Sequence, residues 1–376
     1  MPEEQRCSIL SWEIKMDRKE LENRNQKIID AVLRKEKSLC PGAIALIGIY
    51  GSFQTGDIHP LSDLDLLILI NDDRGWQLAE AFIQEDAGIG YDIYCTSWES
   101  LEEDATYEHP HISKLMDAQI VYCADEKYRN KLELLRSQVR RILTEPFCEK
   151  DCLKAEKTMN EAMRCFALAM TEDDLAAIRR QAGGVLYFVE NAVAMLNKTY
   201  FRKGVGRRFE ELNAMIKKPK DLCKMIDGVV AAETAGSLKE QLTELIKEMN
   251  ACLEEARQEL ASEKQTPAEI LPGTYEEMYS NWHGKMSLAA KTGDRHLAFM
   301  TLSSLNEMIE DIRNQTHIGI LDVLSVYDPK DLKKTAEEFD QILQKYSEEY
   351  TKAGLKPVQY RTIDDFVSGY LRKGSE

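Results

Sequence analysis

The stretch GSFQTGDIHPLSDLDLLIL, residues 51–69, decides how this 376-residue sequence is interpreted. It begins with Gly-Ser directly after the apolar run AIALIGIY (43–50), and it contains most of a second apolar run, DLDLLILI (63–70). Both runs are short and rich in isoleucine or leucine, as buried β-strands are. The sequence therefore predicts a strand, a Gly-Ser turn, a connecting loop and a second strand.

Two aspartates, Asp63 and Asp65, stand at the entrance of the second predicted strand. Because side chains alternate along a strand, both point to the same side, with Cα atoms roughly 6.5 Å apart. Two carboxylates at this spacing can bind one hard cation, and their mutual repulsion is costly without one. A solvated strand entrance is the alternative interpretation. In the turn, Gly51 lets a phosphate approach the backbone N–H groups closely, and the Ser52 hydroxyl adds a donor.

The sequence around these runs predicts a small sheet domain. A helical pattern extends to about Cys40 and is broken by Pro41 and Gly42. The stretch RGWQLAEAFIQEDAG (74–88) is typical of a helical connector, and IGYDIYC (89–95) indicates a third, weaker strand. Asp92 lies in this third run between apolar or aromatic neighbours. We expect it on a neighbouring strand, as a third carboxylate on the same face of the sheet.

Beyond residue 125 the pattern is almost entirely helical. Helices are expected near 126–145, 148–170, 172–198, 205–217, 235–264, 274–291, 294–316 and 330–350. The predicted fold class is α+β, in which a small mixed β-sheet domain with flanking helices is followed by a large all-helical domain. We place the first domain at residues 1–125 and the second at 126–376, with a loop near 261–275.

The charge of the chain is unevenly distributed. The net charge is −16, and residues 1–125 hold 24 acidic against 11 basic residues, a net charge of −13. This balance argues against binding to a nucleic-acid backbone, which requires basic stripes. It suits a site for a divalent metal or a cationic small molecule, although solubility alone is an alternative explanation.

No apolar run approaches the roughly 18–20 residues that cross a bilayer, and the N-terminus is too polar for a secretory signal. We therefore expect a cytoplasmic protein without membrane contact. In that setting its nine cysteines are reduced thiols.

Several other residues have two open interpretations. The stretch FRKGVGRR (201–208) either reaches over the cleft to bind phosphate or caps a helix end. His109 and His111 form an H-x-H pair that could ligate zinc, but no cysteine or acid cluster accompanies them, which favours an ordinary loop. Near the start of the helix expected at 148–170, Lys150 and Lys154 either contact phosphate or are ordinary surface lysines. Glu145 and Glu149 are an alternative choice of base.

The order of these features resembles the DNA polymerase beta nucleotidyltransferase superfamily. A strand is followed by Gly-Ser, then ten residues, then Asp-apolar-Asp, and a later strand carries a third acid. Within that superfamily, residues 43–95 look most like the bacterial small-molecule and minimal nucleotidyltransferases, such as the kanamycin and related aminoglycoside enzymes. Those enzymes join a catalytic α/β domain to a helical C-terminal domain.

The resemblance implies a function and a set of site residues. It implies a metal-dependent transferase that moves a nucleoside monophosphate, AMP from ATP, to a hydroxyl of a small-molecule acceptor such as an aminoglycoside, and hence a role in antibiotic resistance. Mg²⁺, in a two-metal site, and an NTP donor are the implied cofactors. The implied nucleotide-binding residues are Gly51, Ser52 and Ser62, and the implied catalytic and metal-binding residues are Asp63, Asp65 and Asp92, the last as metal ligand or base.

Two alternatives to small-molecule transfer stay open. One is nucleotidylation of a protein or of tRNA in a toxin–antitoxin setting, although the acidic charge disfavours nucleic acid. The other is a nucleotide-binding module that has lost turnover, which the presence of three acids disfavours. Similar enzymes can share the acceptor pocket between two subunits, so a homodimer is also compatible with the sequence.

Overall fold

The computed structural model describes residues 18–56, 58, 62–260, 266–316, 318–319 and 321–372. The chain divides into two compact units, Met1–Leu260 and Ala261–Glu376. This boundary coincides with the start of the proline-bearing stretch 261–275. The finer division at residue 125 stays a prediction.

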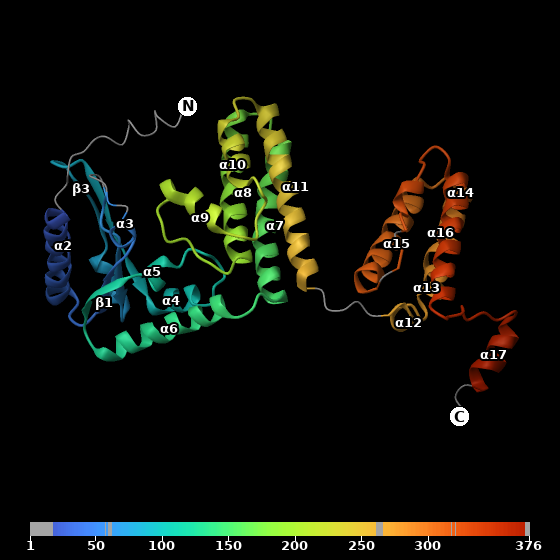
Figure 1. The fold of residues 1–376 in the computed structure, drawn as a ribbon, viewed down its shortest axis with the longest axis horizontal. Coiled ribbons are helices and arrows are strands. Elements are labelled where there is room, and N and C mark those ends of the chain that lie inside the picture. The colour runs from blue at the N-terminus through green and yellow to red at the C-terminus, as the bar shows by residue number, and fades with distance from the viewer. Residues whose placement is uncertain are drawn as a thin grey trace. The chain divides into compact units, whose positions relative to one another are not determined.

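The N-terminal part of the first unit holds all the strands among the described residues (Figure 1). Its elements are α2 (Arg18–Leu39), β1 (Ile44–Ile49), α3 (Ser52–Thr55), β2 (Leu66–Ile70), the 3₁₀ turn η1 (Asp73–Leu78), β3 (Glu80–Gln84), β4 (Ile89–Ile93), β5 (Cys95–Ser97), α4 (Trp98–Asp104), α5 (Ser113–Met116), β6 (Gln119–Cys123) and α6 (Glu126–Thr144). The predicted α+β class, with a small mixed sheet followed by helices, is confirmed.

The main sheet has four strands in the order β5-β2-β1-β6. β1 pairs antiparallel with β2 and β6, whereas β2 pairs in parallel with β5. Every residue of β1 and β2 is buried, because both faces of the sheet are covered. Leu66 and Ile68 belong to the core on the α2 side, and Leu67 and Leu69 to the core that α4, α5 and α6 complete.

Two predictions for residues 74–95 are wrong. The stretch 74–88 forms η1 and then β3 instead of a helix, and Gly88, at φ +65°, closes a hairpin between β3 and β4. The expected third strand is divided into β4 and β5. Among the described strands β4 pairs with β3 alone, in a separate two-stranded sheet. Cross-strand pairing, including a ring stack of Phe82 on Tyr91, overrides the local helical pattern.

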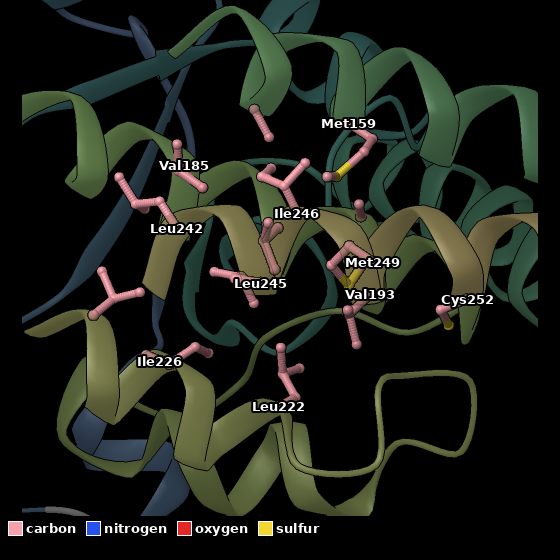
Figure 2. Close-up of a cluster of buried hydrophobic side chains, with 14 of the residues drawn as sticks. Met159, Val185, Val193, Leu222, Ile226, Leu242, Leu245, Ile246, Met249 and Cys252 are labelled. Atoms are coloured by element: carbon pink, nitrogen blue, oxygen red, sulfur yellow. The ribbon is translucent and has the colours of Figure 1, made fainter. Parts of the chain in front are cut away.

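The rest of the first unit is a helical bundle, in which α7, α8 and α11 lie side by side (Figure 1). Its elements are α7 (Glu149–Thr171), α8 (Leu175–Leu196), η2 (Val205–Arg207), α9 (Arg208–Ala214), α10 (Leu222–Ala231) and α11 (Ala235–Leu260). Figure 2 shows their shared core, where Val193 of α8, Leu222 of α10 and Met249 of α11 gather among other apolar side chains. Among the described α-helices of this bundle, α10 alone lies outside the predicted ranges.

The second unit is built from helices around its own core. They are α12 (Pro267–Ile270), α13 (Thr274–Met278), the π-helical turn η3 (Tyr279–His283), α14 (Gly284–Thr292), α15 (Arg295–Gln315), η4 (Leu324–Val326), α16 (Leu332–Lys352) and α17 (Ile363–Arg372). Among the helices that the structure describes, none has the length and apolar character needed to span a membrane. The cysteines of the described ranges are free thiols, in keeping with the prediction.

Candidate functional site

A pocket of about 320 Å³ in the first unit brings the predicted turn and aspartates together with segments far along the chain. Residues from the β1–α3 turn and from the approach to β2 line one part of it, and residues near α5 and between α8 and α9 line the other. The lining residues are Gly51, Ser52, Ser62, Asp63, Asp65, His111, Ser113, Phe201, Arg202, Lys203, Gly204 and Arg208.

The two predicted aspartates both line the pocket, just before β2 begins. Asp63 is exposed, whereas Asp65 is half-buried, and its backbone oxygen accepts a hydrogen bond from the Tyr50 N–H at 3.1 Å. Burial raises the pKa of the Asp65 carboxyl, and the neighbouring charge of Asp63 raises it further. Neither carboxylate has an ion-pair partner within the described ranges. The pair is therefore a concentration of negative charge that a cation would relieve.

The Gly-Ser turn takes the conformation that its sequence suggests. Gly51 has φ +68° and ψ −147°, a backbone conformation that is essentially restricted to glycine. The backbone N–H of Ser52 donates a hydrogen bond to Asp65, which ties the turn to the carboxylate pair. Ser62 is buried, and its carbonyl oxygen accepts a hydrogen bond from Arg24 Nη2 at 2.8 Å.

Basic residues of the stretch 201–208 also line the pocket, so this stretch is more than a helix cap. The Arg202 backbone N–H donates to Glu211 Oε1 at 2.7 Å, and Lys203 Nζ donates to Glu210 Oε2 at 2.7 Å. These bonds hold the segment against α9. Both side chains bring positive charge to a pocket that also holds two carboxylates.

Arg208 anchors the same segment to α8. Its guanidinium lies 3.4 Å from the centre of the Phe201 ring, and its Nε is 3.3 Å from Glu190 Oε2. A second carboxylate, that of Glu211, lies 3.8 Å from Arg208 Nη1. Burial lowers the pKa of Arg208 and raises the pKa of Glu190, so both charges are held at an electrostatic cost.

His111 lines the pocket as well, a position at which the sequence favours an ordinary loop. Its Nε2 lies 2.9 Å from Oδ1 of the buried Asn191, and its ring stacks on Tyr187 at 5.3 Å with an interplanar angle of 3°. Asn191 and Tyr187 belong to α8, about 80 residues further along the chain. Because this proximity arises from packing of the bundle on the sheet domain, no local pattern could have predicted it. No group suited to zinc binding is present in the described part of the chain.

The structure does not bring Asp92 into the pocket. Asp92 is exposed on β4 and pairs with Ala81 across the hairpin. The expectation of a neighbouring strand in the same sheet is therefore wrong. If the parallel pairing of β2 with β5 continued before the Ile68–Cys95 pair, residue 92 would lie opposite Asp65. The paired residues begin at Cys95, however. The assignment of Asp92 to the metal site stays a prediction that rests on the resemblance.

The other candidates lie outside the pocket. Lys154 donates to the carbonyl oxygens of Thr106 and Tyr107 and pairs with Glu108 at 2.9 Å, which is a structural role. The remaining three, Lys150, Glu145 and Glu149, are exposed and do not line it.

The donor set of the pocket fits a small hard cation. Among the described residues no group of three His, Cys, Asp or Glu side chains could hold a metal alone. Mg²⁺ usually takes one or two protein carboxylates and completes its shell with substrate phosphates and water. Asp63 and Asp65 are two such carboxylates without a cationic partner in the described ranges, and the nearby basic residues suit phosphate.

A family model matches the part of the chain that holds the turn and the aspartates. Residues 26–145 match the model described as nucleotidyltransferase domain. Over these residues the chain is similar to a nucleotidyltransferase domain. The match extends from within α2 to the end of α6, so it includes the Gly-Ser turn and both aspartates. It excludes the basic stretch and the helices that follow.

Other comparisons add little. No curated protein matches the sequence. A crystal structure of a nucleotidyltransferase-like protein from Exiguobacterium sibiricum 255-15 is similar over 75% of this chain and 89% of that one, at 12% identity and a TM-score of 0.35. A score this low supports no inference about the present chain.

Proposed function

We propose that this protein is a metal-dependent nucleotidyltransferase that transfers a nucleoside monophosphate, AMP from ATP, to a hydroxyl of a small-molecule acceptor. The observation that carries the proposal is one pocket that is lined partly by residues matching the nucleotidyltransferase model. It combines two carboxylates that have no ion-pair partner in the described ranges with a Gly-Ser turn and two basic side chains. Phosphoryl transfer requires mainly positioning and charge neutralisation, and these groups supply both.

Each group has a place in this proposal. Asp63 and Asp65 would hold Mg²⁺, and the resemblance alone assigns Asp92 as a third metal ligand. A metal ion held there would supply charge neutralisation of the triphosphate and align it for attack. Gly51, Ser52 and Ser62 bind the nucleotide, with Ser52 offering its hydroxyl to phosphate. Arg202 and Lys203 neutralise the phosphates that leave, because their long cationic side chains suit phosphate oxygens.

The acceptor is proposed from charge and resemblance. The net charge of −13 over residues 1–125 favours a cationic acceptor such as an aminoglycoside, which would make the protein an antibiotic-resistance enzyme. A cytoplasmic homodimer is the proposed setting. The choice of ATP over other nucleotides rests on the resemblance alone.

The decisive experiment follows transfer of label from [α-³²P]ATP in the presence of Mg²⁺. The acceptors are a panel of aminoglycosides and lincosamides, with tRNA and the protein itself in separate reactions. Wild-type protein is expected to label a small molecule, and Asp63→Asn and Asp65→Asn are expected to abolish this label. Asp86→Asn, which alters an exposed aspartate in the β3–β4 turn, is the matched control and should transfer normally.

Other outcomes would replace the proposal. Label on tRNA or on protein would select nucleotidylation of a macromolecule. Nucleotide binding without transfer to any acceptor would identify a silent binding module.

A further inference from the structure

His111 is held in one orientation inside the pocket. Its ring lies in a nearly parallel stack on Tyr187, and the Phe201 ring lies 5.6 Å from it on centroids. The Nε2 atom lies 2.9 Å from Asn191 Oδ1, and Asn191 is only 4% exposed. A side chain with its ring stacked and one nitrogen bound to a buried amide has little freedom to rotate.

The hydrogen bond to Asn191 also assigns the tautomer. A carbonyl oxygen can only accept, so Nε2 carries the ring proton in the neutral imidazole. Nδ1 is then left with a lone pair, and no described residue donates a hydrogen bond to it. His111 thus brings a proton acceptor to a pocket that also contains Asp63 and Asp65, with no hydrogen bond or ion pair to either within the described ranges.

The surroundings favour the neutral form. Burial lowers the pKa of His111, the positive charges of Arg208 and His109 lower it further, and the hydrogen bond to Asn191 opposes these effects. The two rings that lie beside it, Tyr187 and Phe201, are uncharged. Besides Arg208, the charged side chains that line the same pocket are Asp63, Asp65, Arg202 and Lys203. A histidine in this state is able to accept a proton near neutral pH.

We propose that His111 is the general base that takes the proton of the acceptor hydroxyl, an inference that rests on the proposed nucleotidyl transfer. The acceptor oxygen forms a bond to the α-phosphorus, and the bond from that phosphorus to the oxygen bridging to the β-phosphate breaks. The bridging oxygen leaves with its electron pair as pyrophosphate. The hydroxyl proton passes to Nδ1 of His111 and from there to solvent.

The carboxylates of the pocket have a different task in this proposal. Asp63 and Asp65 are occupied as metal ligands, and Glu145 and Glu149 lie outside the pocket. His111 is the uncommitted proton acceptor among the lining residues. Asn191 is a positioning residue that fixes the ring.

The test compares His111→Gln with wild-type protein in pyrophosphate release from ATP and Mg²⁺. Kanamycin is the acceptor in one series and water in another. Because general-base catalysis typically contributes 10²–10⁴-fold, His111→Gln should lower kcat about 100-fold or more. It should also remove the acid limb of the wild-type pH profile, while the rise in Tm caused by ATP and Mg²⁺ persists. Imidazole in the buffer should partly restore His111→Ala.

His109→Gln is the matched control, since His109 lies two residues away, pairs with Asp104 at 3.5 Å and does not line the pocket. It should keep kcat and retain an acid limb, which moves only toward higher pH because the charge of His109 no longer lowers the pKa of His111. Two-bond ¹H–¹⁵N spectra of wild-type protein supply a readout that does not depend on any variant folding. They should show the Nε2–H tautomer of His111, and the Nδ1–H tautomer would overturn the assignment.

The possible failures are distinguishable. If wild-type protein releases no pyrophosphate with either acceptor, the proposed function is wrong and the role of His111 falls with it. If wild-type protein is active and His111→Gln matches it in kcat and pH profile, only the role of His111 is wrong. Loss of the ATP-dependent rise in Tm in His111→Gln would also overturn it, because the residue would then act in binding.

Discussion

Gly51 and Asp65 lie so close that no side chain fits between them: a Cβ atom at residue 51 would stand 1.8 Å from Asp65 Oδ2 and 2.5 Å from its Cγ. The glycine at the end of β1 therefore does more than permit a positive φ. It makes room for the half-buried carboxylate, and the adjacent Ser52 N–H donates to that carboxylate. The turn and the proposed metal ligand form one structural unit.

Gly51→Ala should displace Asp65 and abolish the rise in Tm that Mg²⁺ and ATP produce together. Gly56→Ala is the control, because Gly56 also has a positive φ, of +77°, but has nothing within 4 Å of the added Cβ. The left-handed conformation of Gly56 costs a side chain about 1–2 kcal/mol. The conformation of Gly51 costs about 1–3 kcal/mol, so both variants should be less stable. Only Gly51→Ala should lose the ligand-dependent shift, measured by differential scanning fluorimetry. Equal shifts in the two variants would contradict the proposed link.

Asp65→Asn should stabilise the metal-free protein at neutral pH. The pKa of Asp65 is higher in the folded protein than in the unfolded chain, so the folded state holds its proton to higher pH. Stability therefore falls as pH rises through the titration of Asp65, and this cost disappears below about pH 4, where both states are protonated.

In EDTA, Asp65→Asn should thus raise Tm at pH 7, by about 2–4 °C for each kcal/mol of cost relieved, and by less at pH 4. Asp63→Asn, at an exposed position, should change Tm less. A lower Tm for Asp65→Asn at pH 7 would show that the carboxylate stabilises the fold.

Within the basic stretch 201–208, substitutions should weaken nucleotide binding only at residues that line the pocket. A hydrogen bond to a charged group contributes about 1.5–3 kcal/mol, so Arg202→Ala should raise the KM for ATP about 10-fold or more. Lys203→Ala should act in the same direction. Arg207→Ala is the control, since Arg207 pairs with Glu210 at 2.6 Å and does not line the pocket. If all three variants have the same KM, the stretch does not bind phosphate.

Residues 1–260 should fold and bind nucleotide without the rest of the chain. The cores of the first unit and that of the second share no residue, and all the lining residues of the pocket lie in the first unit. The truncated protein should show one cooperative unfolding transition and keep the ATP- and Mg²⁺-dependent rise in Tm. Aggregation, or loss of that rise with the fold intact by circular dichroism, would contradict the independence of the unit.

Local pattern predicted much of this structure, for identifiable reasons. Continuous apolar runs predicted β1 and β2, because strands covered on both faces have no polar side. Three-to-four periodicity predicted the long helices α6, α7, α8, α11, α15 and α16, because one stripe of each faces a core. It failed for residues 80–84, where a sequence compatible with a helix is drawn into a strand by the β4 hairpin partner. It also misplaced Asp92, because the residues of a strand do not specify which other strand it pairs with.

The amino-acid sequence by itself determined the Gly-Ser turn, the pair of aspartates before β2 and the α+β class, because these depend on residues close together in the chain. Tertiary structure alone decided which distant groups join them. His111 meets Asn191 only because α8 packs beside the loop before α5, and Arg202 lines the pocket only because the segment before α9 is anchored by Arg208. Contacts between residues 80 to 150 positions apart depend on how whole elements pack. A local sequence pattern does not specify that packing and so cannot predict these contacts.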